Sequence, residues 1–175
     1  MNLKRLAVRA FKMLIVLSIP IIVIMVVLFR KPTVRPVTVG EHPPSFTLQT
    51  LGGKVFKLTA APHKVILINF FTTWCPPCQA EAPDFSRFIN RYHNEVQLVM
   101  IDRREGTVPV SQFIRRYHLQ QAVVLMDYHD ALAQPFGVTG QPETFAIDQK
   151  GVLRAHIVGP MSYGELVQEM HLLQH

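Results

Sequence analysis

The stretch Val65-Ile66-Leu67-Ile68-Asn69-Phe70-Phe71-Thr72-Thr73-Trp74-Cys75-Pro76-Pro77-Cys78 decides the fold. Its first half is a nearly continuous apolar run, which is typical of a buried strand. Its second half opens a helical pattern that reaches about Tyr92, and Pro77 suits the first helical turn because no N–H partner is lost there. With a second apolar run at 96–102, the pattern predicts a β-α-β unit.

The two cysteines of this stretch are the only ones in the chain. The two intervening residues let both sulfurs lie on one helical turn, so a disulfide between them can form and open without rearranging the fold. Unpaired N–H groups and the helix dipole favour a thiolate at the first cysteine. We therefore expect Cys75 to be a nucleophile and Cys78 to resolve the mixed disulfide.

Three other interpretations of the cysteine pair stay open. The pair could form half of a zinc site with His171 and His175, although finger-type sites hold their two halves about a dozen residues apart. A static structural disulfide would close too short a loop to remove much entropy from the unfolded chain. A copper chaperone would join both thiolates to a histidine, but the Met residues are dispersed. We expect no metal and no cofactor beyond the cysteine pair.

Residues 13–29 carry no charge and would span about 25 Å as a helix. Lys12 and Arg30 flank this segment and can reach the membrane surface. The sequence predicts a single membrane-spanning anchor. No small-residue cleavage site follows, so we expect the anchor to be uncleaved, with a cleaved signal peptide as the alternative.

The charge distribution predicts the orientation of this anchor. Four basic residues precede it and three follow it, which favours a cytoplasmic N-terminus and an extracytoplasmic C-terminal domain at the cell membrane. The net charge of +6 arises entirely there, because the first 35 residues hold seven Lys and Arg and no acid. The rest of the chain lacks a basic excess, so we expect no nucleic-acid partner.

The sequence divides into a basic N-terminus (1–12), the anchor (13–29), a proline-containing linker (30–39) and one domain (40–175), which we expect to be monomeric. About 135 residues are enough to bury a core. The patterns predict strands at 46–49, 55–58, 65–71, 96–102, 122–127, 144–148 and 152–158, and helices at 75–92, 110–118, 130–136 and 162–171.

Four features occur in order along the domain: the lead-in Ile68 to Trp74, the Cys75–Cys78 site, Glu81 with Pro83, and the stretch Gly137 to Asp148. Together they resemble the membrane-tethered, extracytoplasmic thiol-disulfide oxidoreductases that serve c-type cytochrome maturation. The resemblance implies a thioredoxin-like α/β fold, with a central mixed sheet flanked by helices and an added N-terminal β-hairpin. It also implies reduction of the heme-binding cysteine pair of an apocytochrome c, with electrons from a membrane thiol-disulfide donor. A general disulfide oxidase or isomerase is the alternative.

The same resemblance implies roles for individual residues. Pro142 matches a cis-proline opposite the disulfide, which would present the backbone of Gln141 to the sulfurs. Asn69 stands where ordinary thioredoxins have a buried Asp, and Glu81 is implicated instead as the acid that shuttles the proton of Cys78. A solvated Glu81 at the helix start is the alternative.

Three further positions are expected to contact substrate. They are Trp74, Pro76 and Glu143; the resemblance suggests that Glu143 shapes the substrate groove, and packing alone is the alternative for Trp74. Two arginine pairs, Arg103-Arg104 and Arg115-Arg116, could steer acidic partners, but paired charges of this kind usually lie on a solvated face.

Overall fold

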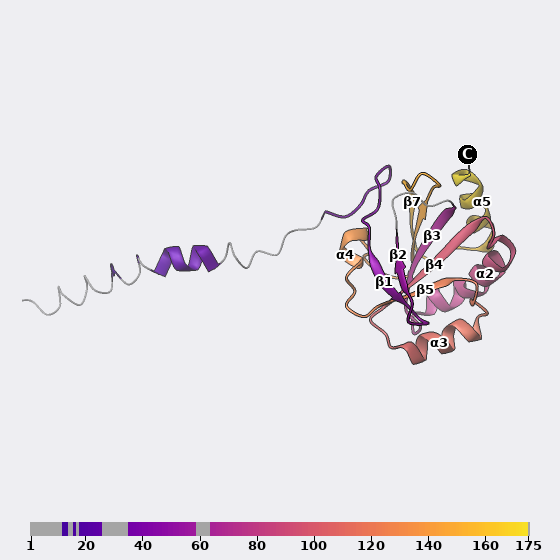
Figure 1. Cartoon of the computed structure of the whole chain (residues 1–175), viewed down its shortest axis with the longest axis horizontal. Coiled ribbons are helices and arrows are strands. Elements are labelled where there is room, and N and C mark those ends of the chain that lie inside the picture. The colour runs from indigo at the N-terminus through magenta and orange to yellow at the C-terminus, as the bar shows by residue number, and fades with distance from the viewer. Residues whose placement is uncertain (1–11, 14–15, 17, 26–34, 59–63, 175) are drawn as a thin grey trace, which may run out of the picture. The chain divides into compact units, whose positions relative to one another are not determined.

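The computed structural model describes residues 12–13, 16, 18–25, 35–58 and 64–174 (Figure 1). The chain forms two units, Met1–Val34 and Arg35–His175, and each is described by itself. The second unit contains the following elements: β1 (Thr47–Thr50), β2 (Val55–Lys57), β3 (Val65–Phe71), α2 (Pro76–Tyr92), β4 (Val96–Arg103), α3 (Thr107–Arg116), β5 (Val123–Asp127), α4 (Ala133–Phe136), β6 (Glu143–Ile147), β7 (Leu153–Val158) and α5 (Tyr163–Leu173).

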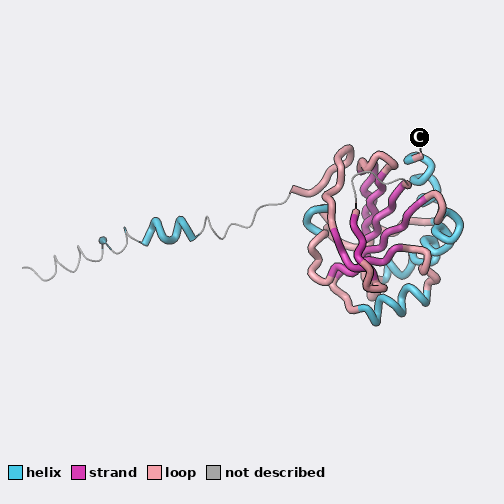
Figure 2. The backbone as a smooth tube through the Cα atoms, viewed as in Figure 1, coloured by secondary structure: helices cyan, strands magenta, loops and turns pink. Residues whose placement is uncertain are grey.

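A seven-stranded mixed sheet in the order β2-β1-β5-β4-β3-β6-β7 forms the centre of this unit (Figure 2). Strands β3, β4 and β5 are parallel neighbours, whereas β6 and β7 run antiparallel on the other side of β3. The N-terminal hairpin extends the sheet because β1 pairs antiparallel with β5. The mixed α/β sheet with an added hairpin, predicted from the sequence, is confirmed.

Strand β3 is buried along its whole length, and its side chains alternate between two cores. Val65, Leu67 and Phe71 face one core, which α2, α3 and α5 cover. Ile68 and Phe70 face the other, where the short helix α4 packs (Figure 1). Because successive strand residues point to opposite faces, Asn69 must point toward α2.

Helix α2 begins where the sequence predicts. Cys75 is its N-cap in extended conformation, and two prolines occupy its first turn, where an N–H would have no partner. Its buried face comprises Cys78, Glu81, Ala82, Phe85, Phe88 and Ile89, a spacing that turns one side of the helix to the sheet. This face places Cys78 and Glu81 against the end of β3.

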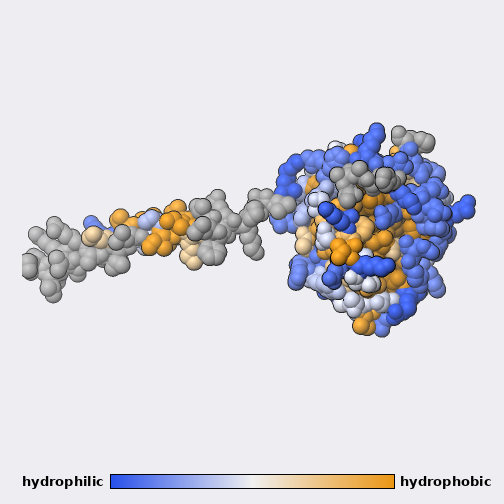
Figure 3. All heavy atoms as spheres, in the orientation of Figure 1, coloured by the Kyte–Doolittle hydropathy of each residue, from blue (hydrophilic) through white to orange (hydrophobic). Residues whose placement is uncertain are grey.

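The first unit is helical over residues 18–25, and its apolar side chains, such as Ile21, Ile22 and Met25, are more than half exposed (Figure 3). Within the described part of the chain, none of the helices has both the length and the apolarity needed to cross a membrane. The predicted anchor lies partly outside the described residues, as do the predicted N-terminus and the start of the linker. At the linker's end, the Val37 N–H donates to Pro135 O over 2.9 Å.

Candidate active site

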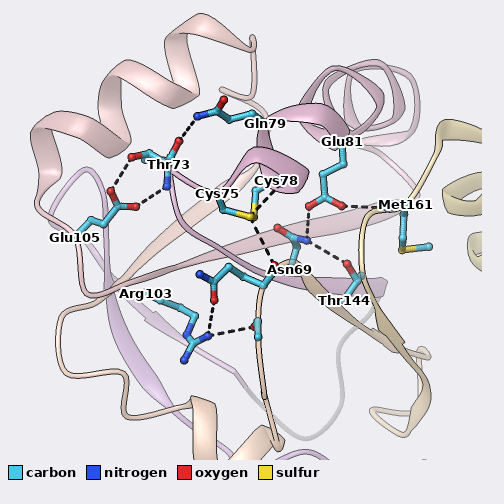
Figure 4. Close-up of a disulfide and its surroundings, with 12 residues drawn as sticks. Asn69, Thr73, Cys75, Cys78, Gln79, Glu81, Arg103, Glu105, Thr144 and Met161 are labelled. Atoms are coloured by element: carbon cyan, nitrogen blue, oxygen red, sulfur yellow. Dashed lines mark hydrogen bonds between the residues drawn. A yellow bond between two sulfur atoms is a disulfide. The ribbon is translucent and has the colours of Figure 1, made fainter.

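The two cysteines form a disulfide at the N-terminus of α2, beyond the carboxyl end of β3 (Figure 4). Both side chains are buried, and their Cα atoms lie 5.2 Å apart. The backbone N–H of Cys78 donates to Cys75 Sγ over 3.2 Å. This N–H is one of the unpaired groups of the first helical turn, so it would also stabilise a thiolate on Cys75 after reduction.

Glu81 lies on the same buried face of α2 as Cys78, only 4% exposed. Its carboxylate accepts hydrogen bonds from Asn69 Nδ2 over 3.0 Å and from the Met161 N–H over 3.1 Å (Figure 4). Burial raises the pKa of Glu81 to about 7, although both hydrogen bonds act to lower it. The alternative of a solvated acid at the helix start is therefore wrong.

Asn69 connects Glu81 to the neighbouring strand. Its Nδ2 also donates to Thr144 Oγ1 over 3.1 Å, and the two residues are directly paired across β3 and β6. Its Oδ1 has no hydrogen-bond partner among the described residues. A neutral Glu81 can donate a hydrogen bond, whereas a carboxylate can only accept one. The hydrogen bonds that Asn69 and Glu81 can form therefore depend on the protonation state of Glu81.

The peptide bond between Gln141 and Pro142 is cis. The carbonyl oxygen of Gln141 lies 3.6 Å from Cys75 Sγ, which brings the loop between α4 and β6 against the disulfide. Pro142 is followed directly by β6, whose first residue Glu143 pairs with Phe70 of β3. Strand pairing thus places this loop opposite the cysteine pair.

Glu143 is fully buried directly beneath this loop. Its Oε1 accepts hydrogen bonds from the Thr139 N–H and hydroxyl and from the Gly140 N–H, and its Oε2 lies 2.6 Å from His156 Nε2. Burial acts to raise the pKa of Glu143, but the hydrogen bonds from His156, Gly140 and Thr139 together hold that pKa below its ordinary value. Glu143 therefore shapes the loop from below rather than facing a substrate directly.

Trp74 and Pro76 flank Cys75 on the surface. The Trp74 side chain is 65% exposed, and Pro76 is exposed as well. A large apolar ring left in water beside a reactive sulfur is available for contact with another molecule.

Glu105 holds the loop before Cys75, and sequence reasoning missed it. Its carboxylate accepts hydrogen bonds from the N–H and the hydroxyl of Thr73, each over 2.6 Å (Figure 4). Gln79 of α2 donates to the Thr73 carbonyl over 2.7 Å. The loop is therefore fixed from two sides just ahead of the nucleophile.

Asp102 is a second buried acid near this loop, opposite Phe71 in the sheet. Burial, with a further contribution from neighbouring Glu105, raises the pKa of Asp102 to about 8. One of its oxygens accepts a hydrogen bond from the Glu105 N–H over 2.9 Å. Asp102 thus supports the segment from which Glu105 reaches Thr73.

The predicted solvated face is wrong for one of the four arginines. The side chain of Arg103 is only 17% exposed and forms an ion pair with Asp130, because β4 turns it toward the loop before α4. Arg104, Arg115 and Arg116 are exposed, as predicted.

The described residues contain no group of three or more His, Cys, Asp and Glu side chains placed to hold a metal ion. Of the two histidines considered for a zinc site, His171 lies in the last turn of α5 and His175 lies outside the described residues.

The profile of the Redoxin family matches residues 38–170 of this chain. Thioredoxin-like protein YneN of Bacillus subtilis is 31% identical over 135 residues, which cover 76% of this chain and 79% of that protein. Thiol-disulfide oxidoreductase ResA of Geobacillus thermodenitrificans is 29% identical over 139 residues, 79% of each chain.

A solved structure has the same fold. It is that of a secreted Mycobacterium tuberculosis disulfide oxidoreductase described as homologous to E. coli DsbE. It is 27% identical, with a TM-score of 0.67, and the match covers 73% of this chain and 96% of that one.

Proposed function

This chain belongs to the Redoxin family and is a thiol-disulfide oxidoreductase of the ResA and DsbE type, and from this premise we propose that it reduces a specific protein disulfide outside the cytoplasm. The substrate we propose is the disulfide of the heme-binding cysteine pair in an apocytochrome c. The observation that carries the proposal is the Cys75–Cys78 disulfide at a helix N-terminus, facing the Gln141 carbonyl at 3.6 Å.

The reaction starts from the dithiol form of the enzyme. The thiolate of Cys75 attacks one sulfur of the substrate disulfide, that S–S bond breaks, and the other substrate sulfur leaves as a thiolate that takes up a proton. Cys78 then loses its proton and attacks the Cys75 sulfur. The Cys75–Cys78 disulfide forms, the second substrate sulfur leaves as a thiolate that takes up a proton, and two electrons have passed to the substrate.

In this scheme Glu81 accepts the proton of Cys78. The side chain lies one turn beyond Cys78 on the same buried face, and a pKa of about 7 lets it change its proton near neutral pH. The hydrogen bonds from Asn69 and Met161 hold the carboxyl group in place while it does so.

The substrate peptide lies along the loop that faces the sulfurs. The N–H of Gln141 has no acceptor among the described residues and can pair with an extended chain in β fashion. Exposed Trp74 and Pro76 border the same sulfur and supply apolar contact.

A membrane anchor at residues 13–29 keeps the domain near its electron donor. The uncharged stretch, its basic flanks and the exposed apolar side chains of residues 19 and 21–25 support this part of the proposal. We place the folded domain on the extracytoplasmic side, with a membrane thiol-disulfide protein as the donor. Such a donor is required because an oxidising compartment would otherwise keep the pair as a disulfide.

Trapping tests the substrate. The full chain carrying Cys78→Ala should retain its partner as a mixed disulfide through Cys75. Mass spectrometry of the adduct should identify the apocytochrome c peptide that contains the heme-binding cysteine pair. The matched control, Cys75→Ala, should trap far less.

The redox potential tests the direction of electron flow. A potential near or below about −250 mV supports a reductant, and one near −120 mV supports the alternative of an oxidase. Recovery of oxidase partners alone in the trap would contradict the cytochrome assignment.

A further inference from the structure

Arg103 connects three separate segments at the edge of the active site. From the end of β4, its Nε and Nη2 donate to the two carboxylate oxygens of Asp130, each over 2.8 Å. Its Nη1 donates to the Gly140 carbonyl over 3.1 Å and to Gln141 Oε1 over 2.8 Å. Figure 4 shows the guanidinium lying beside the loop that faces the disulfide.

Burial and hydrogen bonding hold the Arg103 guanidinium in one orientation. The side chains of Arg103 and Asp130 are 17% and 10% exposed, and their two parallel hydrogen bonds fix the plane of the guanidinium. The adjacent Arg104 provides the contrast, because its side chain is 69% exposed and approaches Asp130 only to 3.5 Å. A fixed guanidinium can in turn fix whatever accepts its remaining hydrogen bonds.

The remaining hydrogen bonds determine how Gln141 is presented. Arg103 has only donors, so it must receive the oxygen of the Gln141 amide and not its nitrogen. The amide NH2 group of Gln141 then has no protein partner among the described residues. The residue is half-buried, and its own carbonyl lies 3.6 Å from Cys75 Sγ. The residue whose backbone faces the reacting sulfur therefore also carries a side-chain hydrogen-bond donor that no group in the described part of the chain uses.

We propose that Arg103, anchored by Asp130, is a positioning residue that orients the Gln141 amide so that its NH2 group donates to a backbone carbonyl of the peptide that carries the substrate disulfide. Arg103 does not touch the sulfurs and acts through Gln141. The inference deepens the proposed function, since it concerns how the same site holds a peptide, but it requires only that the substrate be a disulfide-bearing peptide.

The test uses the full chain, reduced beforehand and mixed with excess substrate in single-turnover experiments. Fluorescence of Trp74, the chain's only tryptophan and the neighbour of Cys75, reports oxidation of the pair. Two probes are compared: a synthetic peptide with a Cys-x-x-Cys disulfide, and bis(2-hydroxyethyl) disulfide, which is neutral and has no peptide backbone.

Arg103→Met should raise the half-saturating peptide concentration by about threefold to tenfold, the effect of losing the one hydrogen bond between the Gln141 amide and the peptide. The maximal rate should stay within about twofold. The rate with bis(2-hydroxyethyl) disulfide should not change. Arg104→Met, the same substitution at the neighbouring position, should match the wild type with both probes.

A double-mutant cycle separates this role from general support of the fold. Gln141→Met should raise the half-saturating concentration as much as Arg103→Met does, and adding Arg103→Met to it should raise the value by less than about twofold. Equal slowing of both probes by Arg103→Met would overturn the proposal. So would an undiminished effect of Arg103→Met in the Gln141→Met background, or a Gln141→Met variant that binds peptide normally.

These outcomes are independent of the cytochrome assignment. If the Cys78→Ala trap recovers other substrates while the synthetic peptide shows the expected pattern, the proposed substrate fails and the role of Arg103 stands. If the trap succeeds and the peptide shows no effect, the reverse holds.

Discussion

The buried carboxyl group of Glu81 makes the stability of the domain depend on pH, and Glu81→Gln removes that dependence. Glutamine has nearly the same shape and never ionises. Its oxygen can still accept from the Met161 N–H, and its NH2 group can donate to Asn69 Oδ1 once the Asn69 amide rotates. The substitution therefore changes the charge while it retains the hydrogen bonding.

The number of protons bound by the folded and the unfolded chain decides whether the free energy of unfolding rises or falls with pH. Below pH 4.5 Glu81 is protonated in both the folded and the unfolded chain, so the full stability is present. Between pH 4.5 and about 7 the unfolded chain releases this proton while the folded chain retains it, so the free energy of unfolding falls as pH rises. The gap between these two pKa values corresponds to about 3 kcal/mol lost by pH 8.

Guanidinium unfolding of the oxidised proteins at pH 4.5 and pH 8, followed by Trp74 fluorescence, measures this difference. The stability of the glutamine variant relative to wild type should rise by about 3 kcal/mol from the lower to the higher pH. Asp102 also has a raised pKa, but it is present in both proteins and cancels in the comparison.

Glu95→Gln, at an exposed position, is the control and should show no such change. If wild type and Glu81→Gln keep the same stability difference at both pH values, the prediction fails, because burial then does not oppose the ionisation of Glu81.

Two further substitutions test the surroundings of the site. Glu105→Gln leaves the Thr73 N–H and hydroxyl with a weaker acceptor. It should lower the free energy of unfolding by about 1–2 kcal/mol and speed hydrogen exchange of the Thr73 amide. Unchanged exchange would refute the role given to Glu105. Gly137→Ala places a side chain at φ +74°, with its Cβ 2.9 Å from Pro36 Cβ, and should cost about 1–2 kcal/mol in thermal or chemical unfolding. The matched change Gly164→Ala, in α5 with open space around it, should instead stabilise slightly, and equal effects of the two would contradict the strain argument.

Sequence periodicity predicted most elements to within a few residues because apolar runs decide them. The strand at 65–71 and the helix that ends at Tyr92 appear as expected. Helix α3 was expected from residue 110, yet it begins at Thr107, since Pro109 occupies its first turn, where a missing N–H costs nothing. The position of the hairpin beside β5 was not predicted, because neighbours in a sheet depend on contacts between distant strands.

The candidate active site likewise contains some residues that the sequence predicts and others that it does not. The cysteine pair was predicted from its short motif, and Pro142 from the resemblance to the thiol-disulfide oxidoreductases. The contact between Glu81 and the Met161 N–H joins residues 80 positions apart, and nothing local in the sequence indicates it. Arg103 was misjudged for a similar reason, since its partner Asp130 approaches only through the fold.

The pairing of β3 with β6 sets the distance between the two halves of the active site. Phe70 pairs with Glu143 across these strands, Cys75 follows shortly after the end of β3, and Pro142 immediately precedes β6. The geometry thus depends on chain length as much as on chemistry. A single-residue insertion between Phe71 and Cys75, or between Pro142 and Glu143, would leave every side chain intact and still move the sulfur away from its partner loop. We therefore expect an insertion at either place to impair the site even where every residue of the site is retained.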